Sequence, residues 1–167
     1  MQVEYKDLPE LREKFRHKKI VFCSGSFDLT HVGHLLFFED CKKHGNLLFV
    51  SIGSDALIKQ SKGNSRPILN EYVRMKMVDS LKPVDYCFLD NVLDERNNYH
   101  GLKLAFEKLR PDVYVINSDV SNLNYREDLC KEYGIKLVIL ERTCPKKFDN
   151  ISTTQIIKKI KDLSPEQ

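Results

Sequence analysis

The chain has no tryptophan, only seven glycines and no apolar run long enough to span a membrane. Its five cysteines are scattered, odd in number and never spaced as Cys-x-x-Cys, which argues against a zinc site and indicates free thiols in a reducing compartment. No signal-peptide core is present near Met1, so a cytoplasmic location is expected. The net charge of +3 is too small to indicate a nucleic-acid-binding protein, and no membrane contact is expected.

Two common phosphate-binding motifs are also missing. Neither Gly-x-Gly-x-x-Gly nor Gly-x-x-x-x-Gly-Lys-Ser/Thr occurs, so neither a dinucleotide fingerprint nor a P-loop kinase is supported. A redox flavoprotein on a similar sheet likewise has no support in the sequence.

Short apolar runs alternate with amphipathic segments along the chain, and this alternation predicts parallel strands joined by helical crossovers. The expected fold is α/β, a Rossmann-like doubly wound five-stranded parallel sheet in a single domain, as the length of 167 residues favours. Residues 1–18 are expected to be a peripheral segment and residues 19–163 the domain proper, whereas the polar stretch 54–67 reads as a loop. The expected strands are 19–23, 47–52, 84–89, 113–116 and 135–140, and the expected helices are 31–43, 70–81, 97–109, 125–133 and 153–163.

The stretch GSFDLTHVGH, residues 25–34, follows the first expected strand and opens the first long helix. His31 and His34 are three residues apart, so they lie on one face of the first helical turn, beside unsatisfied backbone N–H groups and the positive end of the helix dipole. Such a place binds phosphate, and two imidazole donors there can stabilise charge that develops on a phosphate under attack. On these residues alone, an ordinary packed or solvated histidine pair is an equal alternative.

This stretch resembles the GxFDxxHxGH signature of the cytidylyltransferase-like nucleotidyltransferases. That group includes glycerol-phosphate cytidylyltransferases, heptose-phosphate adenylyltransferases and archaeal FAD synthetases. The resemblance implies that His31 and His34 are catalytic at the α- and β-phosphates, that Gly25, Ser26 and Phe27 bind the nucleotide, and that Asp28 contacts the acceptor.

Three further segments extend the resemblance over residues 19–162. SDALIKQSKGNSRP resembles a segment of heptose-phosphate adenylyltransferases and FAD synthetases, which implies that Lys59 and Lys62 are catalytic cations, although a solvated charge run is the alternative. Arg74 corresponds to an arginine that implies contact with the acceptor phosphate, although a helix-surface ion pair is equally expected. Asp119 follows the fourth expected strand, where the family has an aspartate that implies acceptor or base contact.

The segment ISTTQII, residues 151–157, resembles the family's second motif, and Ser152 is expected to cap the last helix. The resemblance implies nucleotide contacts from Ser152, Thr153 and Thr154, and from Arg142 upstream. Residues 144–150 separate Arg142-Thr143 from this motif by more than is usual in the family.

The expected activity is therefore transfer of a nucleoside monophosphate from a nucleoside triphosphate to a phosphorylated small molecule such as a sugar or polyol phosphate, with release of pyrophosphate. Positioning and charge stabilisation would drive it without a covalent intermediate. Triphosphate chemistry implies Mg²⁺, no dedicated metal site is expected, and the family suggests a homodimer. Arg142-Thr143 with ISTT favours CTP slightly over ATP; the alternatives are a heptose-phosphate-type or FAD-synthetase-type adenylyltransferase, and a nucleotide-binding module without turnover.

Overall fold

The computed structural model describes residues 1–94, 99–141, 145–148 and 151–163. A six-stranded sheet runs through it in the order β1-β4-β3-β2-β5-β6, and every strand pair is parallel. The chain builds outward from β2 to β3 and β4 and then crosses back to β5, so the topological switch point lies between β2 and β5. The strands are β1 (Gln2–Val3), β2 (Ile20–Gly25), β3 (Leu47–Gly53), β4 (Tyr86–Asp90), β5 (Val113–Asn117) and β6 (Lys136–Leu140).

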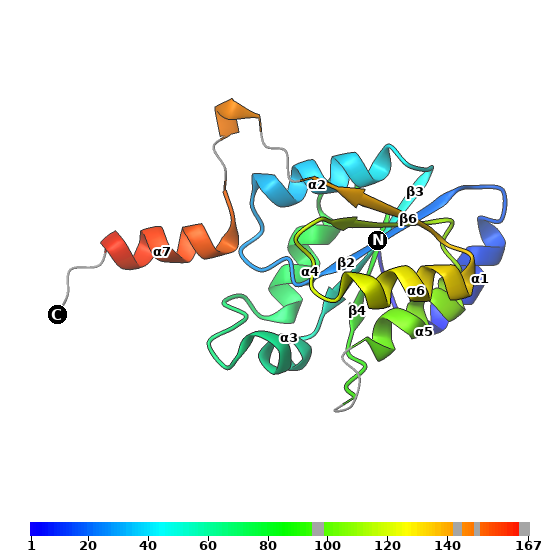
Figure 1. Ribbon diagram of the computed structural model, residues 1–167, viewed down its shortest axis with the longest axis horizontal. Coiled ribbons are helices and arrows are strands. Elements are labelled where there is room, and N and C mark those ends of the chain that lie inside the picture. The colour runs from blue at the N-terminus through cyan, green and yellow to red at the C-terminus, as the bar shows by residue number, and fades with distance from the viewer. Residues whose placement is uncertain (95–98, 142–144, 149–150, 164–167) are drawn as a thin grey trace.

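Helices cover both faces of this sheet, as the expected doubly wound fold requires (Figure 1). Short 3₁₀ turns lie at η1 (Tyr5–Asp7) and η2 (Lys146–Phe148). The helices are α1 (Leu8–Lys14), α2 (Val32–Lys42), α3 (Asp55–Lys62), α4 (Glu71–Asp79), α5 (His100–Leu109), α6 (Leu123–Tyr133) and α7 (Thr153–Leu163).

The core consists of two apolar layers because successive strand residues point to opposite faces. Phe22 of β2 packs with Phe106 of α5 and Leu129 of α6 on one face, whereas Cys23 packs with Phe38 of α2 and Val78 of α4 on the other. The four described cysteines, Cys23, Cys41, Cys87 and Cys130, are free and buried. No described helix has the length and apolar character needed to cross a membrane.

Two expectations about the fold were wrong. The sheet has a sixth strand because Gln2 and Val3 pair with Cys87 and Phe88, so the N-terminal segment belongs to the sheet edge. The stretch after β3 begins with a helix, α3, rather than a loop: Ser54 caps it by accepting a hydrogen bond from the Leu57 N–H at 3.4 Å.

The remaining expected strands and helices are present, with ends displaced by a few residues. The expected start of the third long helix at Asn97 lies outside the described residues. Figure 1 shows that α7, the last described helix, extends away from the body of the molecule with its first turn nearest the sheet.

Candidate active site

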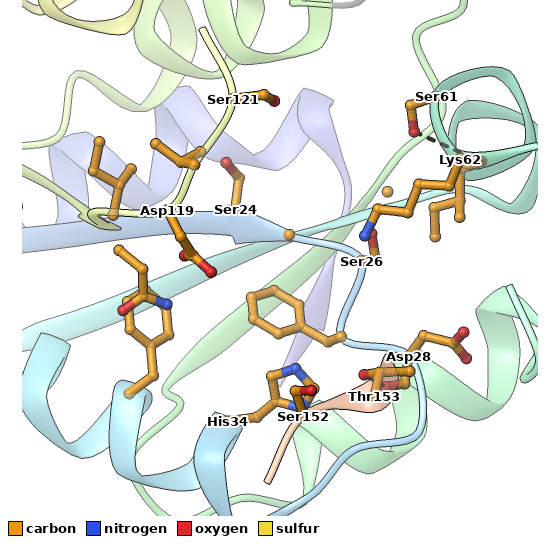
Figure 2. Close-up of a pocket in the computed structure, with 18 of the residues that line it drawn as sticks. Ser24, Ser26, Asp28, His34, Ser61, Lys62, Asp119, Ser121, Ser152 and Thr153 are labelled. Carbon is orange, nitrogen blue, oxygen red and sulfur yellow. Dashed lines mark hydrogen bonds between the residues drawn. The ribbon is translucent and has the colours of Figure 1, made fainter. Parts of the chain in front are cut away.

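A cleft of about 940 Å³ opens at the carboxyl ends of β2, β3, β4 and β5, where an open α/β sheet places its ligands. The start of α2, the start of α7 and one side of α3 form its walls on the β2 and β3 side, and the segment from β5 into α6 forms the opposite wall. Figure 2 shows Lys62 and Asp119 on opposite sides of this cleft, both pointing toward its centre.

His31 and His34 stand side by side at the start of α2 and line the cleft. His31 is the N-cap, and its Nδ1 accepts a hydrogen bond from the Gly33 N–H at 3.1 Å. The His34 Nδ1 accepts from the His31 N–H at 3.4 Å, and the two rings stack with centroids 3.9 Å apart. A ring whose Nδ1 accepts carries its proton on Nε2, so this arrangement equips both histidines as Nε2–H donors.

Two glycines allow this packing. A Cβ on Gly33 would lie 2.9 Å from Cε1 of the His31 ring, and a Cβ on Gly25 would lie 2.9 Å from the Phe27 ring. Phe27 is buried with a positive φ of 47°, and its ring meets His34 edge-on at a centroid distance of 5.5 Å. Gly25 and Phe27 therefore shape the floor beneath the histidines, while Ser26 also lines the cleft.

The start of α7 is tied to the start of α2. Thr153 Oγ1 donates a hydrogen bond of 2.8 Å to the Asp28 carbonyl, and Gly33 faces the Ile151 carbonyl, which would lie 3.3 Å from an added Cβ. Ser152 caps α7 as expected, because its Oγ accepts from the Gln155 N–H at 3.3 Å. Ser152, Thr153 and Thr154 all line the cleft, so the N-termini of two helices converge on it.

Asp28 is placed differently from the expected acceptor contact, although it borders the cleft. Its carboxylate is buried and accepts from Arg66 Nε at 2.9 Å and from the N–H groups of Ile68 and Leu69 at 2.9 and 3.0 Å. Burial by itself raises the pKa of Asp28, but these N–H groups and the Arg66 guanidinium outweigh burial and hold that pKa below its usual value. Asp28 thus positions the chain between α3 and α4.

Arg74 is a second residue whose position disagrees with the expected role. The side chain is fully buried and bonded within the protein: it donates to the carbonyls of Leu69, Ser26 and Gly53 at 2.7–2.9 Å and pairs with Asp55 at 2.8 Å. Because these contacts use the nitrogens of the guanidinium, the side chain is not available to bind the phosphate of an acceptor substrate. Arg74 therefore holds together the ends of β2 and β3 and the start of α3.

The two lysines of α3 differ in their position relative to the cleft. Among the described residues that line the cleft, Lys62 is present and Lys59 is not. Lys59 is exposed and lies outside the lining of the cleft, although side chains three positions apart on a helix are only about 60° from one another. The expectation that both lysines act as active-site cations is therefore met in position only by Lys62.

At the far wall, Asp119 lines the cleft after β5 as expected, together with Asn117. The expected nucleotide contact Arg142 lies outside the described residues. Sequence reasoning missed Asp90 at the end of β4 and Arg126 in α6, both of which line the cleft. Burial raises the pKa of Asp90, and its position at the carboxyl end of a strand was the available signal.

Within the described ranges, no group of three or more histidines, cysteines or acidic residues is arranged to hold a metal ion. On the side of α2, α7 and α3, the cleft offers the chemistry of an anion site: two helix N-termini, two imidazole donors, Lys62 and the ion-paired Arg66, whereas Arg126 lies on the far wall.

Comparison with known proteins bears on this site. The family model described as cytidylyltransferase-like matches residues 22–159, which include both the histidine pair and the start of α7. The bifunctional protein HldE of Syntrophotalea carbinolica is 35% identical over 151 residues, and HldE of Helicobacter pylori is 35% identical over 154 residues. These matches cover 90% and 92% of this chain but only 28% and 30% of the relatives, so the chain spans less than a third of their length.

Solved structures agree on the fold. The lipopolysaccharide core biosynthesis protein from Thermoplasma volcanium superimposes with a TM-score of 0.59 at 25% identity, over 77% of this chain and 98% of that protein. Pantoate-beta-alanine ligase from Francisella tularensis, crystallised with a beta-gamma ATP ligand and beta-alanine, gives a TM-score of 0.64 at 15% identity, over 100% of this chain and 80% of the other.

Proposed function

The chain belongs to the cytidylyltransferase-like family of nucleotidyltransferases, and from this we propose that it transfers an adenylyl group from ATP to the phosphate of a sugar or polyol phosphate. An acceptor phosphate oxygen attacks the α-phosphorus in line, the bond between the α-phosphorus and the bridging oxygen breaks, and pyrophosphate leaves. The observation that carries this proposal is the convergence of the α2 and α7 N-termini, joined by the Thr153–Asp28 hydrogen bond of 2.8 Å, around the stacked His31 and His34.

Each part of the cleft has a role in this reaction. The Nε2–H donors of His31 and His34 bind the α-phosphate oxygens and stabilise the charge that develops there as the acceptor attacks. The first turn of α7, with Ser152 and Thr154, holds the outer phosphates at a helix N-terminus. Lys62, at the end of α3, covers the site on that side. Its positive charge reduces the repulsion between the acceptor phosphate and the triphosphate.

Magnesium enters this proposal with the nucleotide. Mg²⁺ binds through few protein carboxylates and mainly through substrate phosphates and water, which suits a cleft whose described residues form no cluster of metal ligands. When bound, it supplies neutralisation of phosphate charge. Asp28 is not available to it, because its carboxylate is occupied by Arg66 and two backbone N–H groups.

ATP is proposed rather than the CTP that Arg142-Thr143 with ISTT favours. The relatives are HldE proteins, which supports the heptose-phosphate adenylyltransferase branch that the segment 54–67 resembles. A solved structure with 25% identity is of a lipopolysaccharide core biosynthesis protein, which points to a sugar as the acceptor body. We also propose that the chain acts as a homodimer in the cytoplasm, on the resemblance and on its cysteine usage.

The test is pyrophosphate release from ATP and from CTP, each with Mg²⁺ and a panel of sugar 1-phosphates and polyol phosphates. We expect release from ATP with at least one sugar phosphate and at least tenfold lower kcat/KM with CTP. A preference for CTP would move the proposal to the cytidylyltransferase branch, whereas tight nucleotide binding without release from either triphosphate would indicate a binding module.

A further inference from the structure

Arg126 lies near the start of α6 and lines the cleft with Ser121, Asn122 and Tyr99, on the wall opposite α3. Neither the family resemblance nor the proposed chemistry uses it. The side chain is half-buried, so it is fixed by its surroundings and still reaches the cleft.

The guanidinium is held in one orientation by aromatic and backbone partners. Its Nε donates to the Ser121 carbonyl at 3.2 Å, one terminal nitrogen donates to the Tyr114 hydroxyl, and its carbon lies 5.1 Å from the Tyr99 ring centroid. Tyr99 and Tyr114 are fixed in turn, because the Tyr99 hydroxyl accepts from Asn122 Nδ2 at 2.8 Å and the Tyr114 hydroxyl bonds Ser24 Oγ at 3.1 Å. This is a preorganised cationic platform rather than a mobile surface arginine.

Among the described residues, no carboxylate neutralises the charge of Arg126. In residues 1–94, 99–141, 145–148 and 151–163, no acidic group lies within 4.0 Å of it, whereas Arg66, which lines the same cleft, pairs with Asp28, and the fully buried Arg74 pairs with Asp55. A cation near the N-terminus of a helix also opposes the helix dipole, so it costs stability where it stands. A fixed, unneutralised guanidinium in a cleft suits an anionic ligand, which it binds through parallel N–H groups.

The nucleotide does not account for this position. Its negative charge lies in its phosphates, which the proposed function places at α2, α7 and Lys62, and its base and ribose carry none. Lys62 follows β3 and Arg126 follows β5, and β2 lies between those strands, so the two elements are rooted about 10 Å apart in the sheet. A ligand group at Arg126 therefore belongs to the acceptor, at a distance from the phosphate that reacts.

We propose that Arg126 is a specificity-determining residue that binds a second anionic group on the acceptor, a carboxylate or a further phosphate, at the end remote from the reacting phosphate. This inference rests on the proposed function for the placement of the triphosphate. Asp90, Asp119 and Glu141 also line the cleft, and with them the acceptor body between the two anionic groups meets hydrogen-bond acceptors suited to hydroxyl groups.

The experiment compares three probes with one ring: glucose 1-phosphate, glucose 1,6-bisphosphate and glucuronic acid 1-phosphate. Calorimetry with the full chain, Mg²⁺ and α,β-methylene-ATP measures the Kd of each. We expect at least one of the two doubly anionic probes to bind wild type at least tenfold more tightly than glucose 1-phosphate. Arg126→Gln is expected to remove that preference, and Arg126→Lys, which keeps the charge without the planar fork, to keep part of it.

Arg16→Gln, at an exposed arginine outside the cleft, is the matched control and should leave all three values unchanged. If wild type binds the three probes with equal affinity, or binds both doubly anionic probes more weakly than glucose 1-phosphate, this result contradicts the inference without any variant. Loss of α,β-methylene-ATP affinity in Arg126→Gln would contradict it by assigning the residue to the nucleotide.

Pyrophosphate release measured in parallel separates this inference from the proposed function. A preference for the doubly anionic probes without release from ATP supports the anion site and contradicts adenylyl transfer. Release with glucose 1-phosphate and no preference among the probes contradicts only the role of Arg126.

Discussion

Thr153 Oγ1 donates a 2.8 Å hydrogen bond to the backbone carbonyl of Asp28, joining residues 125 positions apart in the chain. The bond connects the first turn of α7 to the segment that leads into α2. Because each helix N-terminus carries a partial positive charge, holding the two together concentrates that charge on one ligand. Figure 2 shows Thr153 beside Asp28 at this junction.

Replacing Thr153 tests this connection. Thr153→Val removes the hydroxyl at nearly constant volume, and a net contribution of about 1 kcal/mol for one hydrogen bond corresponds to an increase of about fivefold in KM for ATP. The thermal midpoint should fall by no more than about 4 °C, since the helix itself retains its cap. Thr153→Ser, which keeps the hydroxyl, is the control; a fivefold loss there too would show that the methyl group and not the bond matters.

Asp28→Asn tests whether this carboxylate has a structural role. The change leaves the Arg66 guanidinium without its charge partner, and we expect a loss of about 3 kcal/mol in the free energy of unfolding by urea at pH 7. The folded state lowers the pKa of Asp28, so the ionised carboxylate contributes stability above its ordinary pKa of about 3.9 and loses it as the pH falls through the lower folded value.

The advantage of wild type over Asp28→Asn should therefore be constant between pH 5 and 7, and shrink below about pH 4. Asp162→Asn, at an exposed position of α7, is the control and should track wild type. An advantage that shrank between pH 7 and 5 would mean a raised pKa and would contradict the described contacts.

The two lysines of α3 provide a matched pair. Lys62→Ala removes a cation that lines the cleft, and losing a charged hydrogen bond of about 1.5–3 kcal/mol lowers kcat/KM by about 10- to 150-fold. Lys59→Ala, at the position one turn earlier that does not line the cleft, should stay within about twofold of wild type. Equal losses in steady-state assays would mean that α3 rotates or unwinds when substrate binds.

Much of the fold was predictable because the local signals were consistent. The apolar run of β3 and the capping residue Ser152 each indicated one structure, and each is found where expected. β1 was missed because two residues cannot show the period of a strand, and their pairing depends on the distant β4. α3 was missed because the polar composition of residues 54–67 suggested a loop, although Ser54 was a recognisable N-cap.

The site was predictable where backbone and motif coincide, as in His31, His34 and Ser152. It was not predictable where tertiary contacts decide which way a charged side chain points. The sequence around Arg74 predicts a residue on the surface of a helix. Arg74 is buried instead, because three carbonyls and Asp55 satisfy its hydrogen-bond donors. Arg126 gave no signal because its aromatic partners come from separate parts of the chain.

The central claim is that the cleft around His31 and His34 directs attack at the α-phosphorus. The most direct test is ³¹P NMR of ATP, Mg²⁺ and the sugar phosphate identified by pyrophosphate release, with wild type, His34→Ala and the exposed control His17→Ala. For wild type and His17→Ala the ATP resonances should give way to pyrophosphate and a diphosphate diester in equal amounts. His34→Ala should fold normally and react about 10²- to 10³-fold more slowly, the usual effect of removing one donor to a developing oxyanion. ADP formation would place the attack at the γ-phosphorus, and an unchanged rate in His34→Ala would remove the histidine pair from the reaction; either result contradicts the account.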